Sequence, residues 1–238
     1  GQGFEVFLVE KETELGGMAR RLHYTLEGMD VQAYLRDLIP KVYQHPSVHV
    51  LTEAAVTEAS GYVGNFTTQV ASGGTMREIH HGVTLIATGA EEYKPTEYLY
   101  GQDDRVMTNL ELEEKISKTD EKVISSQNLV MIQCVGSRDS RYNEYCSGFC
   151  CMYTIKNAIL LKQTYHDMDI TIYYMDIRTF GKGYEQFYQN AQAMGVEFVR
   201  AKVAQIREDA DVNTVVRVEM TATGQVVERT HALIVLSL

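Results

Sequence analysis

The four cysteines of this chain all lie between Cys134 and Cys151, and the remaining sequence has none. Free cysteines usually behave as small buried apolar side chains placed wherever packing suits them, so four structural cysteines should be scattered along a chain. Their clustering therefore indicates a shared ligand. Thiolates can bind zinc, hold an iron–sulfur cluster or form disulfides, and these are the chemistries open to this stretch.

The spacing of the cysteines favours an iron–sulfur cluster among these alternatives. Zinc sites usually contain two Cys-x-x-Cys pairs, and the sequence has no such pair. A four-iron, four-sulfur cluster can accept the adjacent residues Cys150 and Cys151 on different irons, and Gly136 and Gly148 would let the backbone approach its sulfides. A helix that begins near Ser147 would add free backbone N–H groups, which favour an anionic ligand. Zinc, disulfides and inert thiols remain alternatives. Disulfides are typical of secreted proteins, and no signal peptide indicates secretion here.

The composition predicts a globular, soluble protein with one large or two modest cores. The chain has 238 residues, 45% of them hydrophobic and 23% charged, and its formal net charge is −10. This acidic balance argues against a nucleic-acid partner and is compatible with docking onto basic proteins. No apolar run approaches the roughly 20 residues of a membrane-spanning helix, so we expect no membrane span.

The elements that must position the cysteines follow an α/β order. In the first half, the strand Val6–Val9, a helix from Asp30 and short strands from Val48 lead to a meander over residues 66–81 and a buried strand over residues 83–87. A strand, a helix and a strand thus precede a meander and a return strand.

The second half repeats this plan. Residues 196–199, 214–230 and 232–236 correspond in order and spacing to Val48–Leu51, the first meander and its return strand. We therefore expect two tandem Rossmann-like dinucleotide-binding domains, over residues 1–120 and 121–238, each a parallel sheet with an antiparallel meander. Thr108 and Glu111 predict a capping box at the start of the last helix before this junction.

Three features of the first half together predict a flavin site. Glu10 follows a strand, where a carboxylate can accept two hydrogen bonds from a ribose. Gly16-Gly17 would let the backbone approach a flavin or a pyrophosphate, and Thr88-Gly89 follows the expected buried strand. Each feature alone also fits an ordinary strand end or turn. The glycine-rich loop for the FAD pyrophosphate belongs before Val6, so we expect the chain to be a fragment of a longer polypeptide.

The chain resembles the A subunit of heterodisulfide reductase over essentially its whole length. The cysteine block is the most specific part of this resemblance. The segments that carry it are Val9-Glu-Lys-Glu-Thr-Glu-Leu-Gly-Gly17, Arg20-Arg-Leu-His-Tyr-Thr25, Gly64-Asn65, Ile86-Ala-Thr-Gly-Ala-Glu-Glu-Tyr-Lys-Pro95, Cys134-Val-Gly-Ser-Arg138, Tyr145-Cys-Ser147, Cys150-Cys151 and Asp176-Ile-Arg-Thr179.

The resemblance implies a thioredoxin-reductase-like module that holds FAD, with a 4Fe-4S cluster where related enzymes keep a pyridine nucleotide. The cluster ligands that it implies are Cys134, Cys146, Cys150 and Cys151. The candidate FAD-binding residues are Glu10, Lys11, Gly16, Gly17, Arg21, Val56, Thr88 and Gly89. The chain lacks the first FAD strand, the closing FAD segment and ferredoxin-type cysteines of the full family pattern.

The resemblance also implies partners and a cellular setting. It predicts an anaerobic, cytoplasmic electron-transfer complex in which the B and C subunits reduce a heterodisulfide or a related disulfide. Hydrogenase, formate dehydrogenase or ferredoxin are the further electron partners that it suggests, with a homodimer of this chain in the larger complex. In some family members the FAD bifurcates electrons and sends one of them to ferredoxin.

Two alternative functions are an NAD(P)H-dependent flavin disulfide reductase and a zinc-binding, non-catalytic scaffold protein. The reductase would need a redox-active cysteine pair and a second glycine fingerprint after residues 129–133. That position instead carries Cys134-Val-Gly136, followed by the bulky Arg138, Arg141 and Tyr142. We therefore expect the second domain not to bind a nicotinamide cofactor.

Lys156 is the candidate catalytic residue. It lies on the helix expected from Cys150, beside the apolar positions that should face the sheet. One interpretation is a surface lysine whose ammonium reaches solvent past the apolar stripe. The other is an ammonium that contacts the N5 edge of the flavin and stabilises its reduced, anionic form.

Overall fold

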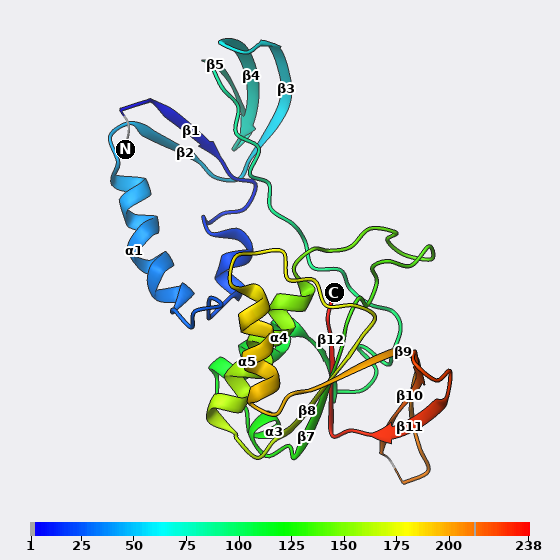
Figure 1. Ribbon diagram of the computed structural model, residues 1–238. Helices are drawn as coiled ribbons and strands as arrows, with labels where there is room; N and C mark the ends of the chain where they lie inside the picture. Colours follow the sequence, from blue (N-terminus) through cyan, green and yellow to red (C-terminus); the bar gives the residue numbers. More distant parts are fainter. Residues whose placement is uncertain (1–2, 212) are drawn as a thin grey trace. The chain divides into compact units, whose positions relative to one another are not determined.

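The computed structural model describes residues 3–211 and 213–238, which form two compact units (Figure 1). Unit 1 contains the residues up to Thr25 together with residues 30–91, and unit 2 contains residues 26–29 and 92–238. The division at residues 91 and 92 precedes the boundary at 120 and 121 that the sequence suggested. The reason is that strand β6 (Val106–Thr108) pairs with β12 (Leu233–Leu236), which ties residues 92–120 to the second unit.

Unit 1 combines a parallel strand pair with an antiparallel meander. Its elements are β1 (Val6–Val9), the 3-10 helix η1 (Gly17–Arg21), α1 (Val31–Gln44), β2 (Val48–Leu51), β3 (Ala54–Tyr62), β4 (Asn65–Ser72) and β5 (Thr75–His81). β1 pairs with β2, and β3, β4 and β5 form a separate three-stranded sheet. Asp30 begins α1 as expected, because its side chain accepts a hydrogen bond of 2.8 Å from the Ala33 N–H.

The buried strand expected over residues 83–87 is wrong. This segment has no strand pairing, and the side chains of Val83, Leu85 and Ile86 are 69%, 89% and 85% exposed. A strand needs a neighbouring strand to pair its backbone N–H and C=O groups. Among the described residues, β1 and β2 pair only with each other, so the apolar composition of the segment finds no sheet into which it can insert.

Unit 2 is built on a seven-stranded sheet. Its remaining elements are α2 (Asn109–Ser117), α3 (Glu121–Ile124), β7 (Asn128–Ile132), α4 (Cys150–Thr164), β8 (Asp169–Tyr174), α5 (Tyr184–Ala193), β9 (Glu197–Glu208), β10 (Thr214–Met220) and β11 (Val226–Thr230). The strand order is β11-β10-β9-β8-β7-β12-β6, in which β9, β8, β7, β12 and β6 run parallel and the β9-β10-β11 meander is antiparallel. The predicted α/β class with Rossmann-like parallel sheets and attached meanders is thereby confirmed.

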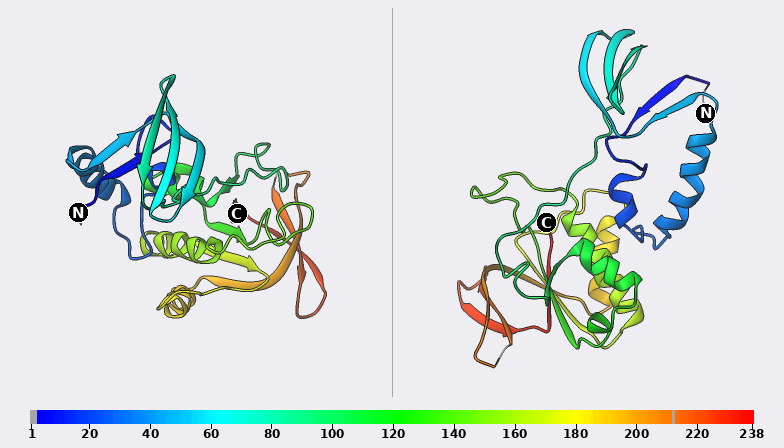
Figure 2. Two further views of the ribbon diagram at one scale, coloured as in Figure 1. Left: turned by 90° about the horizontal axis from the view of Figure 1, so that it is seen from above. Right: turned by 180° about the vertical axis from the view of Figure 1, so that it is seen from behind.

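Two apolar layers enclose this sheet. On one face, Met152 and Ile155 of α4 pack in one buried cluster with Leu129 and Met131 of β7, and Ala191 of α5 joins them. Figure 2 shows the meander on the side of the unit away from these helices. Since odd-numbered and even-numbered residues of β7 face opposite layers, its residues from Leu129 to Ile132 are all buried, as expected for a central parallel strand.

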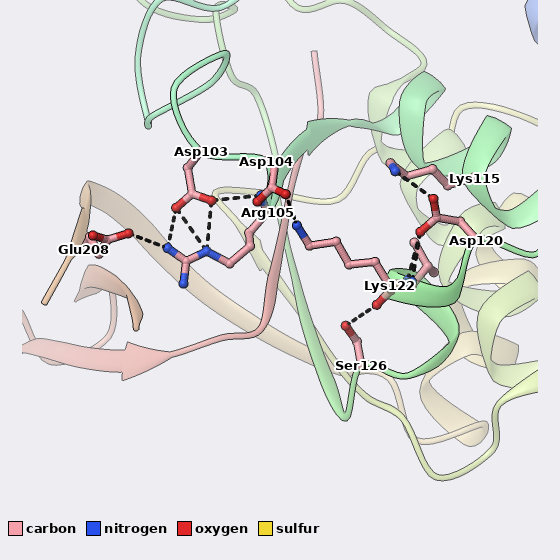
Figure 3. Close-up of polar contacts among 9 residues, drawn as sticks. Asp103, Asp104, Arg105, Lys115, Asp120, Lys122, Ser126 and Glu208 are labelled. Atoms are coloured by element: carbon pink, nitrogen blue, oxygen red, sulfur yellow. Dashed lines mark hydrogen bonds and ion pairs between the residues drawn. The ribbon is translucent and has the colours of Figure 1, made fainter. Parts of the chain in front are cut away.

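Polar contacts fix the start of β6 against its neighbours. Arg105 donates to both carboxylate oxygens of Asp103 and reaches Glu208 on β9 at 2.8 Å (Figure 3). Thr108, the last residue of β6, forms with Glu111 the capping box that the sequence predicted, with both reciprocal hydrogen bonds present. These contacts set where α2 begins, and α2 packs against α4. In the part of the chain that the structure describes, no helix is long and apolar enough to cross a membrane.

Candidate functional site

The candidate site lies at the carboxyl end of β7, the central parallel strand of unit 2. Strand β8 flanks β7 on one side and β12 on the other, and ligands of open α/β sheets bind outside the carboxyl ends of strands at such a point. Cys134 follows the strand almost directly and is buried, with a left-handed φ of 61°. The backbone thus turns sharply at the first cysteine, which holds its thiol at the sheet edge.

Gly136 is required in the turn that follows. Its φ is 68°, and a Cβ atom there would lie 2.2 Å from the Tyr93 ring. Tyr93 therefore packs directly against the cysteine loop, and burial raises the pKa of its phenol to about 12, helped by Glu97. Sequence reasoning missed Tyr93 as a neighbour of this loop, because only the fold brings the two segments together.

The loop after Gly136 folds back on itself and returns Cys146 to the site. The Arg138 N–H donates to the Tyr145 carbonyl at 3.0 Å, and the Asn143 side chain donates to the Gly136 carbonyl at 2.8 Å. Cys146, which follows Tyr145, is half-buried, whereas the other three cysteines are buried. The loop is therefore ordered by its own backbone contacts rather than by disulfides, and all four thiols are free.

The last two cysteines lie in the first turn of α4, as the sequence suggested, although the helix begins at Cys150 rather than near Ser147. Cys150 and Cys151 are the first residues of this helix, and Phe149 at the N-cap makes no side-chain capping hydrogen bond. The first backbone N–H groups of a helix have no partner within it, so they favour a thiolate or an anionic ligand nearby. The cysteines at the start of α4 therefore lie where a negatively charged cluster would be stabilised.

The thiols influence one another's pKa values. Hydrogen bonds from Cys134 and Cys151 lower the pKa of Cys150 to about 2, because both stabilise its thiolate. The same hydrogen bonds to Cys150, together with burial, raise the pKa values of Cys134 and Cys151 above the usual range. Cys146 is near enough to raise the pKa of Cys151 further by charge repulsion.

Fixed charges surround these thiols. Arg138 forms an ion pair with Asp176, and the Cys151 sulfur lies 3.9 Å from the Asp176 carbonyl oxygen. Arg178 approaches the same Asp176 carboxylate at 3.5 Å. Asp176 therefore joins the cysteine loop to the segment after β8, which makes it more than an isolated loop residue.

The four cysteine thiols are the kind of donor set that an iron–sulfur cluster takes. Among the described residues, no group of three or more His, Cys, Asp or Glu side chains has the geometry to hold one ion. A four-iron cluster takes one thiolate on each iron, so its ligands need not converge on a single point. Four free cysteines, one after a strand, one in the following loop and two at a helix start, are compatible with that larger group.

Glu10 and Lys11, two of the candidate flavin residues, lie at the carboxyl ends of β1 and β2 in unit 1. The Glu10 N–H donates to the Leu51 carbonyl at 2.9 Å, and the Ala54 N–H donates to the Glu10 carbonyl at 3.0 Å, which places Glu10 beside the start of β3, the strand of Val56. Lys11 pairs with Glu91 at 3.0 Å, so the segment after Thr88-Gly89 returns to this corner.

The Glu10 carboxylate accepts a hydrogen bond of 3.0 Å from the Glu12 N–H. Gly16 and Gly17 have φ values of 120° and 46° at the start of η1, which ends at Arg21. Val56 is 54% exposed. The assignment of these residues to FAD stays a prediction.

Lys156 is not a surface lysine, so that interpretation is wrong. Its side chain is 4% exposed, and its Nζ lies 2.6 Å from Glu113 Oε2 and 4.4 Å from the centre of the Tyr153 ring. Sequence reasoning missed Glu113, although a buried glutamate on the inner side of α2 is the partner that a buried lysine requires. A contact between Lys156 and a flavin stays a prediction.

No protein-family model matches the chain. Its relatives among known proteins share one name, the A subunit of a heterodisulfide reductase. The chain is 34% identical to an iron–sulfur A subunit of CoB–CoM heterodisulfide reductase from Methanopyrus kandleri, and 32% identical to the corresponding protein of Methanocaldococcus jannaschii. Each alignment covers 99% of this chain and 50% of the relative. The A subunit of a ferredoxin/F420H2-dependent CoB–CoM heterodisulfide reductase from Methanosarcina acetivorans is 39% identical over 67% of this chain and 22% of its own length.

The chain thus spans about half the length of the first two relatives. Their alignments run over 329 and 332 positions, more than the 238 residues of this chain, so these relatives carry additional residues inside the matched span.

Solved structures confirm the fold. Thioredoxin reductase from Lactococcus lactis matches with a TM-score of 0.59 at 16% identity, over 99% of this chain and 77% of its own. Thioredoxin reductase from T. acidophilum matches with a TM-score of 0.56 at 13% identity, over 99% of this chain and 69% of its own.

Proposed function

The chain belongs to the family of heterodisulfide reductase A subunits, and from this premise we propose that it is the flavin and iron–sulfur electron-transfer part of such a protein. It would pass electrons between FAD and 4Fe-4S clusters toward the reduction of a disulfide. The proposal concerns the complete protein, because this chain spans about half of its relatives.

The observation that carries the proposal is the convergence of the cysteines at the switch point of the unit 2 sheet. Cys134 from the end of β7 and Cys150 and Cys151 from the start of α4 interact with one another, and the loop returns Cys146 beside them. We propose these four thiolates as the ligands of one cluster. When bound, the cluster would supply a one-electron carrier at the edge of the sheet.

The other residues of the site would control the surroundings of that carrier. The Arg138 guanidinium, held by Asp176, places positive charge beside Cys134 and would offset part of the negative charge of the thiolates. Tyr93 covers Gly136 and would exclude water from that side. In unit 1, Glu10, Lys11, Gly16, Gly17, Arg21, Val56, Thr88 and Gly89 are proposed to bind FAD.

The partners and setting follow from the relatives. We propose that the complete protein works with heterodisulfide reductase-like B and C subunits in a cytoplasmic complex of an anaerobe, as a homodimer within that complex. The names of several relatives include hydrogen, formate, ferredoxin or F420H2. A hydrogenase, a formate dehydrogenase and ferredoxin are therefore candidate electron partners of this protein. Bifurcation of electrons at the flavin is part of the proposal.

The test is to purify the complete protein without oxygen and to measure iron, sulfide, zinc and flavin per chain. We expect about four irons and four sulfides at the Cys134–Cys151 site and one FAD, with a paramagnetic centre that appears on reduction. Cys150→Ser in the same protein identifies the irons that belong to this site. Stoichiometric zinc without iron would instead favour the non-catalytic scaffold. Direct reduction of the flavin by NADH or NADPH, in a protein without iron at this site, would favour the NAD(P)H-dependent disulfide reductase.

A further inference from the structure

Buried polar groups without a hydrogen-bond partner gather around the cysteines. Within the described residues, these groups include both amide atoms of Gln133 and the hydroxyls of Ser137 and Ser147. Gln133 and Ser137 are 7% and 6% exposed. A buried amide or hydroxyl without a partner costs free energy, and native proteins hold few such groups. Gln133, Ser137 and Ser147 are neighbours of the cysteines in the sequence. A ligand bound by the cysteines is therefore a candidate acceptor for their hydrogen bonds.

Gln133 is placed to reach the site from the sheet. Its backbone continues the parallel ladder of β7, since its N–H donates to the Tyr173 carbonyl at 3.0 Å. Side chains alternate between the faces of a strand, so Gln133 continues the row of Leu129 and Met131 on the face that α4 covers. Cys134, the first of the four cysteines, follows Gln133 directly, so the buried amide lies beside the site.

Ser147 approaches the same place from the loop. It follows Cys146 directly, its hydroxyl oxygen is buried, and it lies near enough to Cys150 to influence that thiol. Gln133 next to Cys134 and Ser147 next to Cys146 thus supply a buried N–H and a buried O–H donor beside two of the cysteines. Neither group carries a charge, so both can act without adding to the charge of the site.

We propose that the Gln133 amide and the Ser147 hydroxyl donate hydrogen bonds to sulfur atoms of the iron–sulfur cluster and thereby set its reduction potential. This inference rests on the proposed function, because it requires a cluster at the four cysteines. Reduction adds an electron, so the sulfurs become more negative and accept stronger hydrogen bonds. Donors of this kind therefore stabilise the reduced cluster and raise its potential. Both side chains are positioning and tuning residues, since the cysteines alone bind the iron.

The experiment uses the complete protein, purified without oxygen, in its wild-type form and as Gln133→Met and Ser147→Ala. Methionine keeps the approximate size of glutamine and removes its N–H donors. We expect unchanged iron and sulfide in both variants, and a more negative midpoint potential in redox titrations followed by electron paramagnetic resonance. Ser147→Thr, which keeps a hydroxyl, should restore the wild-type potential.

Thr214→Val is the matched control. The Thr214 hydroxyl is also buried without a hydrogen-bond partner among the described residues, and the residue is 1% exposed, but it lies on β10 away from the cysteines. Its removal should leave the cluster potential unchanged.

Potentials equal to wild type in both Gln133→Met and Ser147→Ala, with iron retained, would overturn the inference and leave the proposed function standing. If Gln133→Met loses its iron, Ser147→Ala decides the question. Iron absent from the wild type would refute the proposed function, and with it this inference.

Discussion

The ammonium of Lys156 on α4 lies 2.6 Å from the carboxylate of Glu113 on α2, and the two side chains are 4% and 0% exposed. Burial lowers the pKa of Lys156, and the hydrogen bond and charge of Glu113 oppose this shift. Next to the pair, the Asn109 amide donates to the hydroxyls of Thr154 and Ser237 at 2.8 and 3.0 Å. A buried polar interface therefore fixes α4, and with it the two cysteines at its start.

Glu113→Leu should destabilise unit 2 by about 3–5 kcal/mol, because it leaves the Lys156 ammonium buried without its carboxylate partner. Lys156→Met alone should also destabilise the protein, since it leaves the carboxylate buried. The double variant should recover much of either loss, because two apolar side chains replace the pair. Urea unfolding of the four proteins gives the coupling energy. Additive effects of the two single variants would contradict a coupled buried pair.

Lys156 is also predicted to influence the flavin. In preparations of the complete protein that hold FAD and iron, we expect Lys156→Ala to lower the flavin potential and to slow electron transfer to the cluster, because a positive charge stabilises a reduced, anionic flavin. Glu113→Leu is an informative companion, since it keeps the lysine and removes its partner. Flavin potentials and transfer rates equal to wild type in Lys156→Ala would assign Lys156 to the α2–α4 interface alone.

Cys150→Ser should remove the cluster. Cys150 interacts with both Cys134 and Cys151, and it ties the start of α4 to the end of β7. We expect the iron content to fall by about four per chain, with loss of the corresponding paramagnetic signal and of local stability. Iron analysis and thermal unfolding measure the two effects. Full iron content in this variant would show that Cys150 is not a ligand.

The fold of unit 2 could be predicted from sequence because its signals are local. The capping box at Thr108 and Glu111 and the start of α4 at Cys150 depend on residues a few positions apart, and the structure has both. The strand expected over residues 83–87 failed for the opposite reason. Its composition is that of a buried strand, but burial depends on a neighbouring strand that the segment itself does not specify.

The candidate site could be predicted only in part. The clustering of the cysteines along the sequence is enough to suggest a shared ligand. The ion pair of Arg138 with Asp176, the packing of Tyr93 on Gly136 and the pairing of Glu113 with Lys156 each join segments more than thirty residues apart. No pattern in a single sequence encodes such pairs, because the fold alone determines which distant residues become neighbours.

Unit 2 is predicted not to bind a nicotinamide cofactor. The loop after β7, which would hold the pyrophosphate, carries Cys134 and the arginines Arg138 and Arg141, and these arginines pair with Asp176 and Asp139. A pyrophosphate would therefore compete with existing ion pairs and with the cysteine ligands. Calorimetric titration of the complete protein with NADH and NADPH should show no saturable binding at unit 2. Tight binding that Arg138→Ala weakens would contradict the prediction.

His231 lies just before β12 and is 7% exposed, with the Tyr173 ring 6.2 Å away. Burial first, and then the nearby charge of Arg229, lower the pKa of its imidazole from 6.5 to about 4, while Glu197 opposes the shift. The folded protein therefore keeps His231 neutral over a pH range in which the unfolded chain protonates it. Its folding stability should be fully present above the unfolded pKa of 6.5 and decrease as the pH falls from there toward about 4.

His231→Phe should remove this acid sensitivity. At about pH 5, protonation of His231 in the unfolded chain should lower the free energy of unfolding by about 2 kcal/mol relative to neutral pH, given the shift of the pKa from 6.5 to about 4. The phenylalanine variant should lack this component, because an apolar ring binds no proton in either state. Urea unfolding of both proteins at about pH 7.5 and pH 5 measures the difference between the two pH dependences. Equal losses in the two proteins would show that His231 titrates alike in the folded and unfolded states, and that other groups cause the acid sensitivity.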